Sequence, residues 1–187
     1  MFRYFVGLWM ADGLRKKRCF GIINKQESII REFIRYFGRR NVRIILLKHR
    51  DYNGKIQIKP DKERNVKIAG KYCYEVYICN SRLLRLAEKI ARLFIECKLR
   101  RQIPEIIAGI FDGDGSISIN LKIIRFSLGR NFQLAYALKR NLELIGVSCF
   151  RPFFEKRGYV YLQIKERFEN RRRFARKLWK FLLHPIK

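Results

Sequence analysis

The chain has 187 residues, 48% of them apolar, and carries 43 Lys and Arg against 16 Asp and Glu, a formal net charge of +27. This composition allows one domain or two small ones, and the charge favours nucleic acid as the partner because basic side chains neutralise phosphates. A ribosomal or membrane-surface protein stays open on composition alone. No apolar run reaches the ~20 residues of a membrane-spanning helix. Five cysteines without a CxxC pair argue against a disulfide framework or a zinc site and fit a reducing cytosol.

The first predicted element is a helix that runs from the start of the chain to Asp12, where Gly13 follows. Residues 5–13 form an apolar run in which Gly7 and Ala11 lie four positions apart and therefore share one face of the helix. A face of small residues lets two helix backbones approach closely. We therefore expect Gly7 to lie in a helix–helix interface, and we expect the glycine after the acid to adopt the left-handed conformation that ends helices.

The rest of the first half alternates between strand and helix patterns. Lys and Gln alternate with Ile at residues 55–59, which predicts a half-buried strand with a basic outer face. Residues 60–71 are the least structured part. Asn80 or Ser81 is predicted to cap the helix that follows the last strand. From the apolar spacing we predict strands at 19–24, 42–47, 55–59 and 72–79, and helices at 29–37 and 80–94.

The second half repeats this order after a basic linker at residues 96–103. Its first helix contains a second copy of the opening run, residues 107–115, in which Gly109 and Gly113 again lie four positions apart and Asp114 again precedes a glycine. Gly109 is therefore also expected in the helix–helix interface. We predict strands at 116–120, 122–128, 147–154 and 159–164, a helix at 132–145, and a basic amphipathic helix at 166–183.

A supersecondary pattern that occurs twice in one chain is a signal at the level of the fold. We predict an α+β fold of two pseudo-symmetric αββαββ(α) repeats, each with an antiparallel four-stranded saddle sheet. The two motif helices pack together and join the repeats. The predicted halves are residues 1–95 and 104–187, with the linker between them.

Two acids stand at equivalent places, at the ends of the two motif helices. If the helices pack side by side, Asp12 and Asp114 end together, and each carboxylate faces the negative end of a helix dipole beside a like charge. Such a pair is expected to bind a divalent metal ion. Asp112 lies two positions before Asp114 and points elsewhere on the helix, so we interpret it as structural.

The two runs, FVGLWMADG and IAGIFDGDG, resemble the LAGLIDADG motif of homing endonucleases, and their spacing resembles the monomeric, two-motif, archaeal intron-encoded members. The second copy is a close match, and the first has Met10 where the motif often has an acid. The resemblance implies a site-specific endonuclease that hydrolyses both strands of a long double-stranded DNA target and leaves 3′ overhangs. It also implies Mg²⁺, with Ca²⁺ or Mn²⁺ as substitutes in crystals, held by Asp12 and Asp114 and by the backbone carbonyls of Ala11 and Gly113.

The resemblance further implies a cytoplasmic, prokaryotic monomer. The abundance of Ile, Arg and charged residues is compatible with a thermophilic archaeon.

Members of this family often place a polar residue at the end of the second strand of each half. Asn24 matches that position in the first half, and the position falls near Ser127 or Leu128 in the second. Because a leucine could neither hold a water nor donate to phosphate, the two sites are expected to be unequal. Lys98 and Arg100 are candidates, by their place in the linker, for the basic residue that completes each site, and binding of the DNA backbone is the alternative role for both.

Strands with one apolar and one basic face suit the major groove, where side chains at alternate positions reach base edges. Any single Lys or Arg among them is about as well explained as a solvated charge or a phosphate contact. Because the halves differ in sequence, the target is expected to be asymmetric. The groove-facing candidates are Arg15, Lys17, Arg43, Lys55, Gln57 and Lys59 in the first half and Ser118, Asn120, Arg125, Arg151 and Gln163 in the second.

Three other functions stay open. An RNA maturase on the same scaffold would bind intron RNA, a non-enzymatic regulator would bind DNA without cutting it, and a basic ribosomal-type protein would lie outside the family. The presence of both Asp12 and Asp114 favours cleavage over the first two, and the duplicated motif argues against the third.

Overall fold

The computed structural model describes residues 1–14, 16–52, 54–67, 71–99, 101–118, 122–155 and 158–183. Internal contacts divide the chain into two compact units: Asp12–Leu86 forms one, and Met1–Ala11 with Ala87–Lys187 forms the other. The first motif helix, up to Ala11, thus belongs to the same unit as the second one. The boundaries of the two sequence halves, at residues 95 and 104, stay a prediction.

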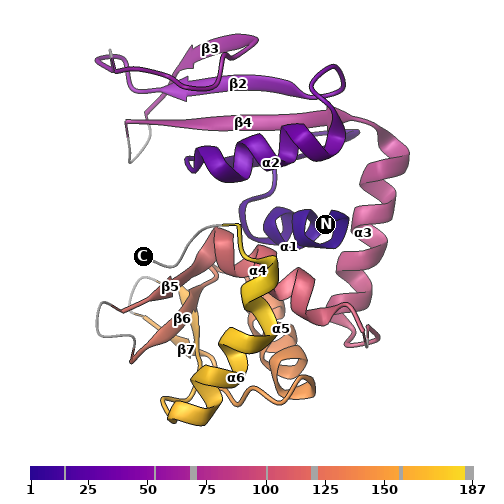
Figure 1. Cartoon of the computed structure of the whole chain (residues 1–187), viewed down its shortest axis with the longest axis vertical. Helices are drawn as coiled ribbons and strands as arrows, with labels where there is room; N and C mark the ends of the chain where they lie inside the picture. Colours follow the sequence, from indigo (N-terminus) through magenta and orange to yellow (C-terminus); the bar gives the residue numbers. More distant parts are fainter. Residues whose placement is uncertain are drawn as a thin grey trace. The chain divides into compact units, whose positions relative to one another are not determined.

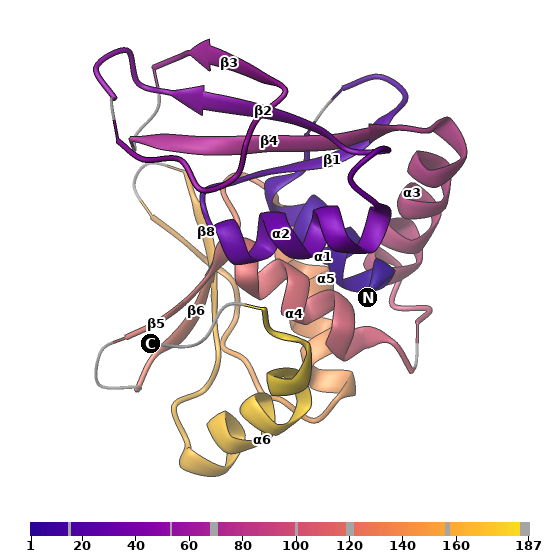
Figure 2. The same ribbon diagram turned by 45° about the horizontal axis from the view of Figure 1, so that its top comes forward.

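The unit Asp12–Leu86 is built on a four-stranded sheet with the strand order β1-β4-β2-β3, of which Figure 1 labels β2, β3 and β4 and Figure 2 labels all four. A helix, α2 (Glu27–Phe37), lies along one face of this sheet, against β1 and β4 (Figure 2). The strands are β1 (Cys19–Asn24), β2 (Arg43–Lys48), β3 (Lys62–Asn65) and β4 (Tyr72–Cys79).

Side-chain alternation along the strands gives this sheet two unlike faces. The face toward α2 carries the buried side chains of Phe20 in β1, Ile44 in β2 and Val76 in β4. The ring of Phe20 stacks on the ring of Phe33 in α2, with the centroids 6.3 Å apart. Each such buried side chain contributes about 1.5–3 kcal/mol to stability, so this face forms the core of the unit.

The strand β3 departs from the predicted antiparallel sheet. It runs parallel to β2, with Ile45 opposite Lys62, whereas β4 pairs antiparallel with both β1 and β2. Asp61 leads the chain into this edge: its carboxylate accepts the Ile44 N–H at 2.8 Å, and its own N–H donates to the Ile44 carbonyl at 2.8 Å. All residues of β3 are exposed and polar, as is usual for an edge strand, so no apolar alternation signals it in the sequence.

The predicted strand at residues 55–59 is wrong. The chain forms a loop there, in which Lys55, Gln57 and Lys59 are exposed and Ile58 is buried. The Arg31 guanidinium donates to the Gln57 carbonyl at 3.4 Å. Because Pro60 follows directly and has no N–H to continue a ladder, the segment does not pair, and the chain enters the sheet only at β3.

The unit of Met1–Ala11 and Ala87–Lys187 combines helices with a second four-stranded sheet, of order β5-β6-β8-β7 with every pairing antiparallel (Figure 1). The strands are β5 (Gly115–Ile117), β6 (Ile124–Ser127), β7 (Phe153–Phe154) and β8 (Val160–Gln163). Four helical segments lie wholly in this unit: α4 (Ile103–Asp114), α5 (Phe132–Leu144), α6 (Phe168–Leu178) and a short 3₁₀ helix, η1 (Trp179–Phe181). It also contains α1 (Phe2–Asp12) up to Ala11 and α3 (Ser81–Ile95) from Ala87 onward.

Aromatic side chains join this second sheet to its helices. The ring of Phe111 in α4 meets Phe126 of β6 and Phe174 of α6 edge to face, each at a centroid distance of 5.3 Å. The helices α4 and α6 therefore cover the face of the sheet that carries Phe126. Asn141 of α5 is fully buried, and its Nδ2 donates to the Phe94 carbonyl at 2.8 Å, which ties the end of α3 to α5.

The predicted α+β class is confirmed, and most predicted elements lie within a few residues of their expected places. The last strand of the first sheet spans the predicted residues 72–79. The N–H of Leu83 donates to Asn80 Oδ1 at 3.1 Å, which makes Asn80 the expected cap of α3. The last helix is shorter than predicted and ends at Leu178, where η1 takes over. Among the described residues, no helix is both long and apolar enough to cross a membrane.

Candidate active site and nucleic-acid interface

Two glycines bring the backbones of the motif helices α1 and α4 into direct contact. A Cβ atom on Gly7 would lie 2.0 Å from the carbonyl oxygen of Ile106, and a Cβ atom on Gly109 would lie 2.0 Å from the carbonyl oxygen of Tyr4. Both distances are far inside normal van der Waals contact. The two contacts are reciprocal, and any larger residue at either position would force the helices apart.

Asp12 ends α1, and its carboxylate is held by Asn24 at the end of β1. The Asn24 Nδ2 donates to Asp12 Oδ2 at 3.1 Å. The Asn24 Oδ1 accepts the Gln26 N–H at 2.8 Å, which fixes the orientation of the amide so that its donor side faces the acid. The structure thus joins a predicted metal ligand to a predicted auxiliary residue.

The surroundings of Asp12 disfavour its charged form. Burial raises the pKa of the Asp12 carboxyl to about 6, and the hydrogen bond from Asn24 offsets part of this effect. In the described part of the chain, Asp12 forms no salt bridge. A half-buried carboxylate with a raised pKa and no salt-bridge partner among the described residues suits a divalent cation, because hard cations prefer oxygen ligands.

Asp114 ends α4 and is half-buried. The glycine after it does not have the predicted left-handed conformation, because Gly115 has φ −85° and ψ 154° and begins β5. A glycine is needed at residue 115 because a larger residue has no room there: its Cβ atom would lie 2.2 Å from Phe111 Cδ2. Asp12 and Asp114 fall in different compact units. Their sharing of one metal site therefore stays a prediction.

Asp112 has the contacts of a structural residue. Its Oδ2 accepts the Tyr4 hydroxyl at 2.8 Å and the Leu183 N–H at 2.8 Å, and the residue is buried. Asp112 therefore ties α1 and the segment after η1 to α4.

The strand pairings establish which residue of the second half corresponds to Asn24. Gly13 bridges to Ile22 in the first repeat, and Gly115 pairs with Phe126 in the second. The residue two positions after Ile22 is Asn24, so the equivalent residue after Phe126 is Leu128. Leu128 is buried and apolar. The sequence left Ser127 and Leu128 as the two possible counterparts of Asn24. The register selects Leu128, whose side chain cannot donate a hydrogen bond to a carboxylate.

The described residues contain no group of three or more His, Cys, Asp and Glu side chains that could hold a metal ion. A metal at the motif acids would therefore need further oxygen ligands, such as the predicted carbonyls of Ala11 and Gly113 and the substrate. Lys98, a predicted auxiliary residue, pairs with Glu96 at 2.7 Å in the turn after α3. Arg100 lies outside the described residues.

The face of the first sheet that points away from α2 has a basic character. Lys16 is anchored on it: its Nζ lies 3.9 Å from the centroid of the Tyr77 ring and 3.9 Å from Glu75 Oε1. The hydrogen bond with Tyr77 and the nearby acid raise the pKa of Lys16. By the strand register, this face carries the exposed basic side chains of Arg43, Lys62 and Arg64.

The other groove-facing candidates of the first half lie in loops. Lys17 is exposed in the turn before β1, and the candidates at residues 55–59 lie in the loop already described. Arg15 falls outside the described residues. The groove-facing candidates predicted from the sequence did not include Lys16, Lys62 and Arg64. Lys62 and Arg64 could not be found there because β3 has no apolar face to mark it as a strand.

In the second half, two candidates are engaged in local hydrogen bonds. Ser118 Oγ accepts the Ile123 N–H at 2.9 Å and closes the hairpin of β5 and β6. Gln163 Nε2 donates to Glu166 Oε1 at 3.0 Å. Arg151 is exposed, and Asn120 lies outside the described residues.

Arg125 lies against the rings of Phe153 and Tyr161, neither of which was among the groove-facing candidates predicted from the sequence. Its guanidinium carbon lies 5.5 Å from the centroid of Phe153 and 5.4 Å from that of Tyr161. Both rings could have been noticed as residues of predicted strands, but only the register shows that they share a face with Arg125.

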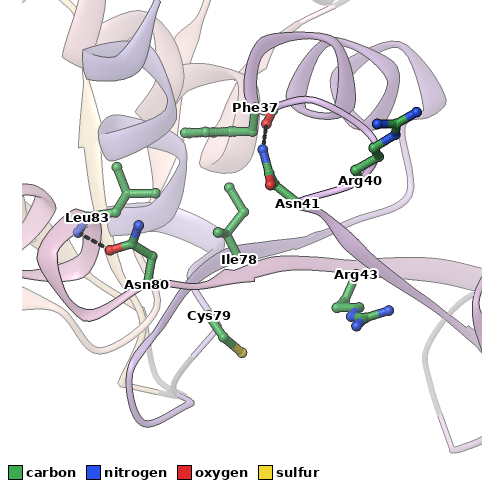
Figure 3. Close-up of a pocket in the computed structure, with 8 residues that line it drawn as sticks. All are labelled: Phe37, Arg40, Asn41, Arg43, Ile78, Cys79, Asn80 and Leu83. Atoms are coloured by element: carbon green, nitrogen blue, oxygen red, sulfur yellow. Dashed lines mark hydrogen bonds between the residues drawn. The ribbon is translucent and has the colours of Figure 1, made fainter.

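A hollow of about 650 Å³ lies at the end of β4 remote from Asn24. Phe37, Ile78 and Leu83 form its apolar part, and the guanidinium groups of Arg40 and Arg43 are turned outward at its rim (Figure 3). Arg43, the first residue of β2, therefore lies at the end of the sheet remote from Asn24 and Asp12.

Solved structures with the same architecture belong to LAGLIDADG proteins. Mesophilic variants of the homing endonuclease I-DmoI are 18% identical, with a TM-score of 0.63 over 98% of this chain and 97% of theirs. A variant of I-DmoI in complex with its target DNA and Mn is 20% identical, with a TM-score of 0.64 over 100% and 97%. The N-terminal LAGLIDADG domain of DUF199/WhiA is 11% identical, with a TM-score of 0.61 over 95% and 81%.

At the level of sequence, no family model and no curated protein matches the chain. The structural similarity nevertheless extends over nearly the whole chain and includes the two helices that carry the motifs. The resemblance indicated by FVGLWMADG and IAGIFDGDG is thus confirmed for the architecture. The chain has the LAGLIDADG fold.

Proposed function

We propose that the chain is a site-specific endonuclease that cuts both strands of double-stranded DNA and leaves 3′ overhangs. The observation that carries the proposal is Asp12, a half-buried carboxylate at the end of a motif helix, oriented by Asn24 and with its pKa raised to about 6. Such a carboxylate does not stabilise the fold, because burial of its charge without a basic partner is unfavourable. A nuclease on this fold would use it as a metal ligand.

Asp12 and Asp114, with the carbonyls of Ala11 and Gly113, would hold Mg²⁺ in this proposal. When bound, the ion would activate water and stabilise the leaving oxygen of the phosphodiester. Asn24 keeps the Asp12 carboxylate oriented through the 3.1 Å hydrogen bond. Partners outside the ligand shell commonly tune metal sites in this way.

The basic face of the first sheet supports DNA as the substrate. Lys16, Arg43, Lys62 and Arg64 lie on the face of the strands opposite α2, where a duplex can approach. Among the described residues of these strands, Glu75 is the acid on that face, and Lys16 neutralises it in part at 3.9 Å. Because the second sheet carries aromatic rings instead, the two halves would read different sequences. A monomer would therefore bind a long, asymmetric target.

The test is selection of cleaved sites from a random DNA library in the presence of Mg²⁺, followed by sequencing of the cut ends. We expect one long, asymmetric site with 3′ overhangs. Asp12→Asn and Asp114→Asn should each abolish double-strand cleavage and leave binding of the selected duplex intact. Glu63→Gln is the matched control. Glu63 is an exposed acid of β3 that pairs with Lys48 of β2, so its neutralisation should leave cleavage intact.

Cleavage that survives both motif substitutions would refute the assignment of the acids. If a duplex is bound but never cut, the chain is a DNA-binding protein and not a nuclease. Selective binding of a structured RNA in place of any duplex would favour the maturase alternative.

A further inference from the structure

The second sheet has an aromatic centre on the face that its helices leave uncovered. Phe126 points toward α4 and α6, so the neighbouring residues Arg125 and Ser127 belong to the opposite face. By the register, Tyr161 lies opposite Ser127 and Phe153 lies opposite Tyr161. Both rings are half-buried, and they stack with centroids 5.7 Å apart and planes 20° apart.

Two polar side chains beside these rings make local contacts. The Arg125 guanidinium lies within 5.5 Å of both ring centroids, in the range of a cation–π interaction. Gln163 Nε2 donates to Glu166 Oε1. The Phe153 and Tyr161 rings therefore form the largest aromatic surface on the middle of this face.

Resting on the proposed DNA substrate, we propose that Phe153 and Tyr161 determine specificity by contacting the C5-methyl groups of thymines in the major groove. A two-stranded ribbon fits that groove, and the thymine methyl is its one apolar feature. Side chains on alternate positions of β7 and β8 would point at neighbouring base pairs. The half of the target bound by this sheet is therefore rich in A·T pairs at its centre.

Stacking on unpaired bases is the less suitable alternative for these rings. Such stacking needs an open ring face. Here one face of each ring meets the other ring, and Arg125 approaches both. A half-buried pair of stacked rings can instead offer an edge to a methyl group.

The test is a deoxyuridine scan of the selected duplex, in which each thymine is replaced singly and the dissociation constant is measured without divalent metal. Uracil pairs as thymine does and lacks only the methyl group. We expect affinity to weaken about fourfold at one or two neighbouring positions, the loss that corresponds to one buried methyl. Phe153→Ala or Tyr161→Ala should remove this sensitivity at the same positions and leave sensitivity elsewhere unchanged.

Phe154→Ala is the matched control, because Phe154 adjoins Phe153 but lies on the other side of the strand, where it packs on Phe132. It should leave the uracil sensitivity intact. If the alanine variants do not fold, Phe153→Leu and Tyr161→Leu keep more of the buried volume. They should change the uracil sensitivity at the same thymine positions. A scan in which neither ring alters the response to any methyl group would overturn the proposal, as would failure to bind any duplex. A duplex that is bound and methyl-sensitive but uncut would refute the nuclease and uphold this inference.

Discussion

Asn24 and Leu128 occupy the same position in the two repeats, and only Asn24 can hydrogen-bond to a motif acid. In the first repeat the amide donates to Asp12 at 3.1 Å, whereas the second repeat places a buried leucine after the equivalent strand. The register of the two strand pairs, Gly13 with Ile22 and Gly115 with Phe126, establishes this equivalence. The proposed active sites are therefore chemically unequal.

This inequality predicts that the two DNA strands are cut at different rates. Asn24→Leu should slow cleavage of one strand by about 10–100-fold, the usual effect of removing a partner of a metal ligand. Leu128→Asn should accelerate cleavage of the other strand or leave it unchanged. A supercoiled plasmid with the target site separates the steps, because the first cut gives a nicked circle and the second a linear product.

Leu144→Asn is the matched control for Leu128→Asn, since it makes the same change at an exposed position at the end of α5 and should leave both cleavage rates unchanged. Equal cleavage rates for both strands in the wild type would contradict the prediction.

The raised pKa of Asp12 predicts how stability depends on pH when no divalent metal is present. Since the pKa in the folded chain is about 6 and the ordinary pKa of an aspartic acid is 3.8, the folded state binds the proton more tightly. The free energy of unfolding should therefore fall as pH rises from about 4 to about 6 and stay lower above that. The full effect is at most about 3 kcal/mol.

Asp12→Asn removes this titration, so without metal the variant should melt above the wild type at pH 7.5 and near it at pH 4. Thermal denaturation across that pH range, with chelator present, measures the difference. Added Mg²⁺ should raise the melting temperature of the wild type more than that of the variant. Parallel pH profiles for the two proteins would show that Asp12 is not the titrating group.

The contact between α1 and α4 predicts that alanine is poorly tolerated at either glycine. Gly7→Ala and Gly109→Ala place a Cβ atom against a backbone carbonyl that cannot move alone. Each should lower the free energy of unfolding by about 3 kcal/mol. Because both substitutions separate the same helices, the double variant should lose less than the sum of the two. Urea denaturation measures all three.

Gly129→Ala provides the comparison. Gly129 has φ 55°, and an added Cβ would have no atom within 4 Å, so only backbone strain of about 1–2 kcal/mol is expected. A similar loss at Gly7 and Gly129 would mean that the helices separate easily.

Two acids only two positions apart should respond differently to substitution. Asp112→Ala leaves the Tyr4 hydroxyl and the Leu183 N–H without their acceptor, which should cost about 2–4 kcal/mol of stability. Asp112→Asn keeps an accepting oxygen and should largely restore stability and cleavage. Asp114→Asn should abolish cleavage with little change in stability. Melting curves and a cleavage assay on the same three variants test the distinction, and a cleavage defect in a stable Asp112→Asn protein would contradict it.

Local patterns in the sequence were sufficient for much of this protein. Helical spacing and the cap at Asn80 depend on neighbours within a turn or two, so they can be read without coordinates. The four-residue spacing of small residues after Gly7 and Gly109 is also local, and it predicted the close approach of two helices that the structure shows. The two motifs likewise indicated the fold. The alternation at residues 55–59 misled because two isoleucines at alternate positions do not make a strand when Pro60 blocks pairing.

Tertiary structure decided the features that depend on which segments meet. The pairing of Gly115 with Phe126 makes Leu128 the counterpart of Asn24, and no local pattern contains that register. The parallel strand β3 has an entirely polar sequence, and its place is set by the hydrogen bonds of Asp61 with Ile44. The Phe153 and Tyr161 rings meet only because two strands pair. Periodicity reports which residues are buried, whereas contacts between distant segments depend on the packing of the whole unit.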